Sequence, residues 1–129
     1  MSTEFDNLKS RSNLVRSFQA AFVGIGSALK HERNFQIHII GTATVVLLLV
    51  ILGASGLEWA VIVGCIALVL VAELLNTVLE HILDYFKPEV NPAIKTMKDM
   101  AAGAVLIAAV AALVVGALIL LPKIIDLFT

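Results

Sequence analysis

The chain is poor in cysteine and in charged residues. Cys65 has no second cysteine to pair with and no metal-type spacing around it, which excludes a disulfide framework. The formal net charge of −1 argues against the concentrated basic surface that nucleic acid requires. The first residues carry Glu4 and Asp6 and lack a basic start followed by an apolar stretch, so we expect no cleaved signal peptide.

Apolar residues are abundant instead. Hydrophobic residues make up 60% of the chain and charged residues 15%, whereas soluble domains usually have about 45–50% and about 25%. The 129 residues suffice for one domain, and a domain this small cannot hide so much apolar surface from water. We therefore expect an all-α integral membrane protein, solvated mainly by the bilayer.

Three runs contain no Asp, Glu, Lys or Arg: residues 37–52, 59–72 and 100–121. The second run continues as a helical pattern to about residue 86. A helix needs about 20 residues to cross the hydrocarbon layer, so the second and third runs are long enough and the first is slightly short. The pattern predicts transmembrane helices over about 36–54, 57–86 and 98–121, within one membrane domain covering 1–129.

An amphipathic helix is predicted before the first span, over about 12–31. Its apolar stripe recurs every three or four residues, at Leu14, Phe18, Phe22, Ile25 and Leu29. Such a helix can lie along the membrane surface with its aromatic side among the headgroups. The alternative is a helix in water that packs on the protein's own loops.

Basic residues predict the orientation. All but one of the lysines and arginines precede the first span or lie between the second and third: Lys9, Arg11, Arg16, Lys30, Arg33, Lys87, Lys95 and Lys98. Cytoplasmic loops carry such an excess, so the N-terminus and the second loop should be cytoplasmic and Lys123 should lie outside. We expect a multi-pass protein of the bacterial cytoplasmic membrane.

An acidic row interrupts the second span. Glu73, Asn76, Glu80 and Asp84 are spaced three, four and four residues apart, which keeps them within an arc of about 80° on one helix face. An acid at the bilayer centre costs about 2.5–3.5 kcal/mol. Asp84, and even Glu80, could be ordinary residues of a helix end. Glu73 lies roughly 16 Å from Asp84 along the helix and should face another helix or a polar cleft.

Other charged residues are expected on the same side of the membrane. Lys98 and Asp99 open the third span, and Glu32 precedes the first. Converging carboxylates beside cations suit Mg²⁺ that carries nucleotide phosphates, and a further acid could accept the proton of an attacking hydroxyl. The Gly24–Lys30 segment matches neither common phosphate-loop motif. His38 is interpreted as an interfacial residue, and a zinc site is not expected.

These residues resemble a known family. The segment Glu73-Leu-Leu-Asn76-Thr-Val-Leu-Glu80-His-Ile-Leu-Asp84, followed by Lys98-Asp99 and an alanine-rich span, is similar to the small prokaryotic diacylglycerol kinases, as is Glu32-Arg-Asn-Phe35. The resemblance looks closest to the Gram-positive branch, the undecaprenol kinases. It implies a homotrimeric helix bundle with active sites shared between subunits at the cytoplasmic surface. It also implies transfer of the ATP γ-phosphate to a membrane lipid alcohol, converting undecaprenol to undecaprenyl phosphate.

The resemblance also implies residue roles. Glu73 would be the general base, and Glu32 and Glu80 would bind Mg²⁺. The residues that would contact ATP are Glu32, Glu80, Glu89, Val90, Asn91, Lys98 and Asp99, with Lys98 against phosphate and Asp99 toward ribose or adenine. Asn76 would order Glu73, and Asp84 would have a supporting role.

Three positions depart from the family pattern. Val78 stands where a small residue is usual, Asn91 replaces a frequent histidine, and Ala20 stands where some members have a tyrosine. These departures weaken the transfer of family roles to the Glu89–Asn91 loop and to packing near the site.

Other functions remain open on the sequence. Diacylglycerol offers the same hydroxyl chemistry as undecaprenol. A cation-conducting helix bundle would also place acids in the membrane, but it predicts that they continue across the bilayer. A noncatalytic assembly subunit would explain Gly103 and Gly116 as packing residues, but not the acidic row.

Overall fold

A computed structural model describes residues 2–86 and 91–129, with side chains from residue 13 onward. All of the described secondary structure is helical. The chain forms two compact units, Met1–Arg33 and Asn34–Thr129. The first unit consists mainly of α1 (Ser2–His31), on which the five residues of the predicted stripe are all exposed.

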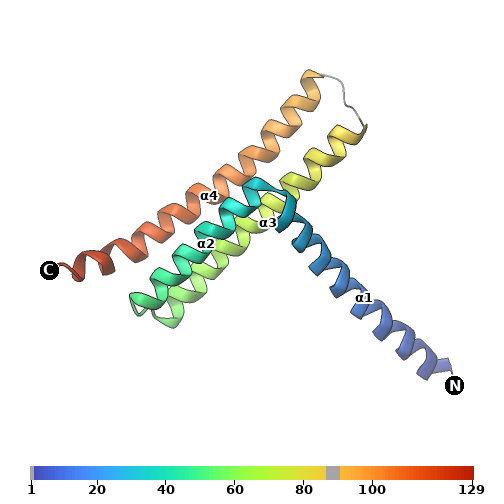
Figure 1. The fold of residues 1–129 in the computed structure, drawn as a ribbon, viewed down its shortest axis with the longest axis horizontal. Helices are drawn as coiled ribbons and strands as arrows, with labels where there is room; N and C mark the ends of the chain where they lie inside the picture. Colours follow the sequence, from blue (N-terminus) through green and yellow to red (C-terminus); the bar gives the residue numbers. More distant parts are fainter. Residues whose placement is uncertain (1, 87–90) are drawn as a thin grey trace. The chain divides into compact units, whose positions relative to one another are not determined.

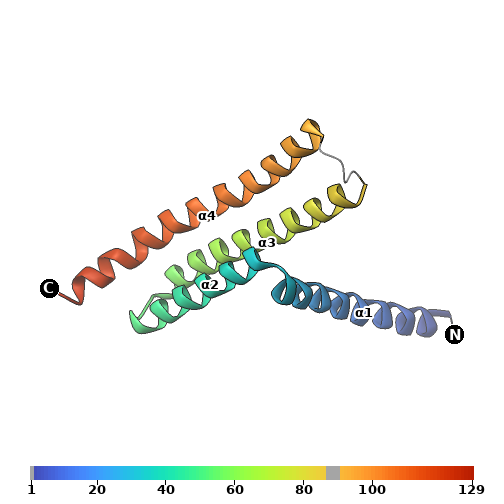
Figure 2. The same ribbon diagram turned by 45° about the horizontal axis from the view of Figure 1, so that its top comes forward.

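The second unit is an antiparallel arrangement of three helices, α2 (Arg33–Ile51), α3 (Gly56–Phe86) and α4 (Pro92–Asp126). Figures 1 and 2 show α3 and α4 side by side, with α2 beside the first half of α3. The C-terminal end of α4 therefore lies near the turn between α2 and α3. The second half of α3 has α4 as its neighbour within this unit.

Each of these three helices is long and apolar enough to cross a membrane. Together they confirm the predicted all-α membrane class. Within their most apolar windows only 11%, 22% and 17% of the residues are buried inside the structure. Most of the helix surface therefore needs lipid or another subunit to cover it.

The turn between α2 and α3 is specified locally. The N–H groups of Gly53 and Ala54 donate to the carbonyls of Val50 and Leu49, which is the Schellman pattern of a helix end, and Gly53 adopts the positive φ of 63° that this motif requires. Helix α3 then begins with a capping box. Ser55 N–H donates to Glu58 Oε2 (2.7 Å) and Glu58 N–H donates to Ser55 Oγ (3.3 Å).

Helix α4 begins at Pro92, whereas the apolar run predicted a start at about residue 98. The side chain of Asn91 accepts a hydrogen bond from Ala93 N–H (2.9 Å), and proline suits the first helical position because it has no N–H to leave unpaired. The residues that α4 adds before residue 98 include Lys95 and Thr96, which separate them from the uncharged apolar run.

The hydrophobic core lies at the end of the unit near the α2–α3 turn. Its buried members come from all three helices: Leu49, Ile62 and Leu120. Lys123 at the end of α4 pairs with Glu58 at the start of α3, with 3.1 Å between Nζ and Oε2. We call this region, with its core, capping box and ion pair, the closed end.

Candidate active site

The acidic row lies on α3 beyond the closed end and contains both buried polar residues of the described chain. Glu73 is only 2% exposed and Asn76 only 6%. Exposure then rises along the helix: Glu80 is half-buried, and the side chain of Asp84 is 63% exposed. The row is therefore buried at Glu73 and open at Asp84. We call this region of α3, with its partners on α2 and α4, the polar end.

Asn76 links two members of the row and keeps one polar atom without a partner. Its Nδ2 donates to Glu80 Oε1 at 3.4 Å, a weak hydrogen bond. Its Oδ1 is buried and has no hydrogen-bond partner among the described residues. Because a buried acceptor without a partner costs about 1–3 kcal/mol, such atoms tend to mark sites that a ligand, ion or partner completes.

His38 on α2 lies beside the deepest acid. Its Nε2 is 3.7 Å from Glu73 Oε2, and the side chains are 25% and 3% exposed respectively. The sequence analysis interprets His38 as an interfacial residue and does not predict this contact. The one sequence signal is a histidine near the start of an apolar run. That signal does not name a partner, because His38 and Glu73 meet only when α2 and α3 lie antiparallel.

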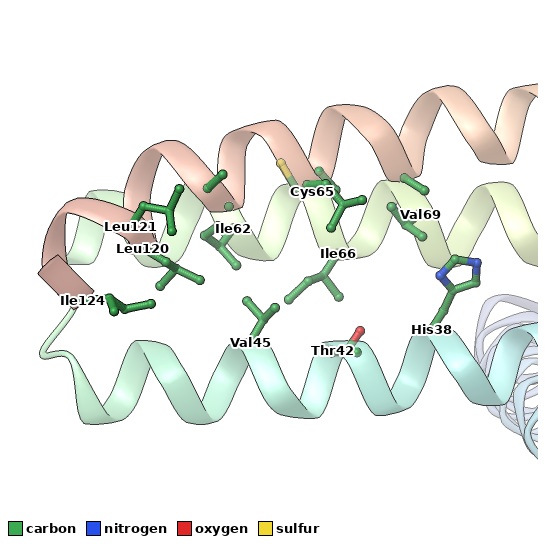
Figure 3. Close-up of a pocket in the computed structure, with 16 residues that line it drawn as sticks. His38, Thr42, Val45, Ile62, Cys65, Ile66, Val69, Leu120, Leu121 and Ile124 are labelled. Atoms are coloured by element: carbon green, nitrogen blue, oxygen red, sulfur yellow. The ribbon is translucent and has the colours of Figure 1, made fainter.

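An apolar cavity of about 490 Å³ begins at His38 and runs toward the closed end. Figure 3 shows His38 at one end of the cavity and Ile124 near the other, with side chains of α2, α3 and α4 directed into the space between them. Cys65 contributes to its wall. A mainly apolar space with a polar group at one end suits an amphiphilic ligand.

Two ion pairs lie at the exposed end of the row. Lys98 on α4 contacts Asp84 on α3, and Lys95 pairs with Asp99 one turn along α4 at 2.6 Å. Lys98 and Asp99, two of the residues expected to contact the nucleotide, therefore each have an oppositely charged partner in this structure. Asp84, whose role the sequence could not separate from that of a helix end, is the partner of Lys98.

Two further predicted site residues lie elsewhere in the described elements. Glu32 belongs to the first compact unit, and Asn91 caps α4. Glu89 and Val90 lie outside the described residues. Within the part of the chain that the structure describes, no three His, Cys, Asp or Glu side chains form a group that could hold a metal ion.

These features define a class of protein. The second unit has three membrane-type helices, an apolar cavity lined at one end by His38, and a buried carboxylate, Glu73, 3.7 Å from that histidine. Further charged residues follow Glu73 along α3 and at the start of α4. Comparison with known proteins agrees with this class. A family model of prokaryotic diacylglycerol kinases matches residues 19–120. The chain belongs to the prokaryotic diacylglycerol kinase family.

Two characterised relatives are similar over most of the chain. The undecaprenol kinase of Bacillus subtilis is 36% identical over 118 residues, which cover 92% of this chain and 96% of that protein. The diacylglycerol kinase of Synechocystis is 39% identical over 116 residues, which cover 89% of this chain and 66% of that protein. The chain is accordingly a membrane-bound phosphotransferase that uses an alcohol group as acceptor, as the sequence predicted.

Proposed function

We propose that the protein transfers the γ-phosphate of ATP to the hydroxyl of undecaprenol in the membrane. The observation that carries this proposal is the buried carboxylate of Glu73, which lies 3.7 Å from His38, a residue that lines one end of the apolar cavity. A lipid alcohol has the matching form, with one hydroxyl at the end of a long apolar chain. The cavity would receive the first part of that chain, and Glu73 would face the hydroxyl.

Glu73 is the proposed general base. A positioned carboxylate that removes the hydroxyl proton contributes about 10²–10⁴-fold to such a reaction. The phosphoryl group then passes in line from ATP to the lipid oxygen, and most of the catalysis comes from positioning and charge neutralisation. Lys98 would exchange Asp84 for a phosphate group, and Asp99 would turn from Lys95 toward the nucleotide.

Mg²⁺ is the proposed metal, held by Glu80 and Glu32. It would neutralise charge on the ATP phosphates when bound, and its preference for oxygen ligands fits the donors present. Glu80 offers a half-buried carboxylate, and the unpartnered Oδ1 of Asn76 lies in the same cluster. Two protein carboxylates are a usual number for Mg²⁺ bound together with nucleotide phosphates.

Undecaprenol is the proposed lipid because the acidic row resembles most closely the undecaprenol kinase branch. The similarity to the undecaprenol kinase of Bacillus subtilis, over 92% of this chain, supports this choice. Diacylglycerol is the alternative acceptor, because the same base and cavity could serve either hydroxyl.

A homotrimer in the cytoplasmic membrane, with its polar end toward the cytoplasm, completes the proposal. The low burial of the three spans leaves wide helix faces for contact between copies. A neighbouring copy could also bring Glu32 to the row. The distribution of lysine and arginine supports the cytoplasmic orientation.

The test is phosphorylation of each lipid by purified protein. Mixed micelles containing undecaprenol or diacylglycerol are supplied with Mg-ATP labelled at the γ-phosphate, and lipid-bound label is counted. We expect labelled undecaprenyl phosphate, with a higher kcat/KM than for diacylglycerol. Label on diacylglycerol alone would contradict the substrate assignment, and label on neither lipid would contradict the proposed function.

A further inference from the structure

Glu73 is shielded from water, so a proton that it accepts has to pass through a neighbouring side chain to reach solvent. Its side chain is 3% exposed, and Asn76, in the same buried row, is itself buried. The residues of α4 that line the neighbouring cavity are apolar, such as Ala109 and Ala112. Among the residues that line the cavity, the titratable ones are His38 and Cys65.

His38 connects the buried carboxylate with a more accessible region. Its Nε2 lies 3.7 Å from Glu73 Oε2, yet its side chain is 25% exposed. The turn of α2 that precedes it carries the exposed polar residues Asn34 and Gln36, so this end of the helix suits contact with water. An imidazole can accept and release a proton near neutral pH, which an amide or hydroxyl cannot do.

The reaction requires that Glu73 lose a proton in every cycle. In the proposed transfer the lipid oxygen forms a bond to the γ-phosphorus, the bond from that phosphorus to the ADP oxygen breaks, and the hydroxyl proton moves to Glu73. Glu73 is then a neutral carboxylic acid and cannot act as a base again. A proton acceptor must restore the carboxylate before the next lipid reacts.

We propose that His38 is this acceptor and returns the proton to water. The O–H bond of protonated Glu73 breaks and an N–H bond forms at Nε2 of His38. The imidazolium ring then rotates toward the exposed polar residues at the start of α2 and releases the same proton to water. The charges and atoms of the cycle then balance, with water as the final acceptor. The distance of 3.7 Å is longer than a hydrogen bond, so a side-chain rotation has to close it, and the adjacent cavity leaves room for that rotation.

This inference rests on the proposed kinase function and predicts a kinetic signature of its own. If His38 only removes the proton from Glu73 after transfer, replacing His38 leaves the rate of the first turnover unchanged and slows the later turnovers. If His38 instead holds Glu73 in position, its loss slows the first turnover as well. The first and later turnovers therefore separate a proton relay from a structural role.

The experiment is rapid-quench measurement of His38→Gln with undecaprenol and Mg-ATP in mixed micelles. We expect a burst of about one phosphorylated lipid per active site at the wild-type rate, followed by a steady state about 100-fold slower. Added imidazole should speed the steady state of His38→Ala, because the truncated side chain leaves space for it. His38→Ala provides the same burst measurement if the glutamine disturbs packing.

The matched control is His81→Gln, which changes an exposed histidine of α3 and should leave both phases as in the wild type. A wild-type steady state in His38→Gln would overturn the relay, and so would a first turnover slowed as much as the later ones. If the wild type phosphorylates lipid, either of these results with His38→Gln contradicts the relay but not the proposed kinase function. If the wild type phosphorylates no lipid, the proposed kinase function itself is contradicted.

Discussion

The closed end and the polar end of the three-helix unit are built differently, although the same helices form both. At the closed end, Leu49 is fully buried, and Glu58 is bound by both Ser55 and Lys123. At the polar end, two polar residues are buried, the Oδ1 of Asn76 has no hydrogen-bond partner among the described residues, and a cavity adjoins His38. The polar groups of the closed end are paired, whereas the polar end keeps one buried acceptor that a ligand could use.

This difference teaches where function lies in a small membrane protein. Rules of packing and hydrogen bonding that hold for stability tend to be broken at functional sites. The closed end supplies the packing that holds α2, α3 and α4 together. The polar end can then keep an unpartnered acceptor and ion pairs that a substrate could replace.

The largest expected effect comes from removing the buried acid of the polar end. Glu73→Gln should lower kcat by about 10³-fold or more while leaving thermal stability nearly unchanged, because the amide keeps the shape but cannot remove a proton. The measurement is lipid phosphorylation together with a melting curve in micelles. Glu58→Gln is the control from the closed end and should keep kcat, so equal losses in both variants would contradict the division between the ends.

The second change weakens the closed end. Leu49→Ala should lower the free energy of unfolding by about 2 kcal/mol, near the lower limit for buried leucine, because a leucine released from this core enters lipid rather than water. Reversible unfolding in mixed micelles would measure this loss. Leu47→Ala alters a leucine of α2 that is 59% exposed and should cost much less. Similar losses from the two variants would show that Leu49 is not part of a packed core.

The third change removes the unpartnered acceptor. Asn76→Ala should change the free energy of unfolding by less than about 1 kcal/mol, because the weak hydrogen bond to Glu80 and the cost of the orphaned oxygen are lost together. We expect kcat to fall by about tenfold, since Glu80 loses the neighbour that orients it. Paired unfolding and phosphorylation assays test this. A large loss of stability without loss of kcat would assign Asn76 to the fold instead.

The smallest expected effect concerns the ion pair of Lys98. Asp84→Asn should lower the KM for Mg-ATP by about two- to fivefold, because an exposed pair is worth at most about 1 kcal/mol and Lys98 no longer has to leave a carboxylate. The ratio of mutant to wild-type KM should approach one at high ionic strength, where exposed charges are screened. A higher KM in Asp84→Asn would instead place Asp84 among the groups that hold the nucleotide.

Several features of the fold were accessible from local sequence. The apolar runs predicted three membrane helices, and three helices of suitable length and composition are present. The Ser55–Glu58 pair and Gly53 carry a readable turn signal as well, because capping boxes and glycine helix ends depend on residues close in the chain. Helix α4 begins before the predicted span, because hydropathy does not report the part of a helix that extends beyond the apolar run.

The candidate site was predicted only in part. The spacing of Glu73, Asn76 and Glu80 placed them on one helix face, since helical periodicity is a local property. The contact of His38 with Glu73, and the pairing of Lys98 with Asp84, each join two helices. Such contacts depend on the rotation of each helix about its axis and on the offset between neighbouring helices. Residue spacing within one helix predicts neither of these.

The sequence by itself determined that this chain spans a membrane and carries an acidic row on its second span, because composition and helical periodicity act within each segment. Only the tertiary structure decided which acid is buried, what lies beside it and where a cavity opens. Glu73 is buried beside His38 of another helix, and packing is a property of several segments at once.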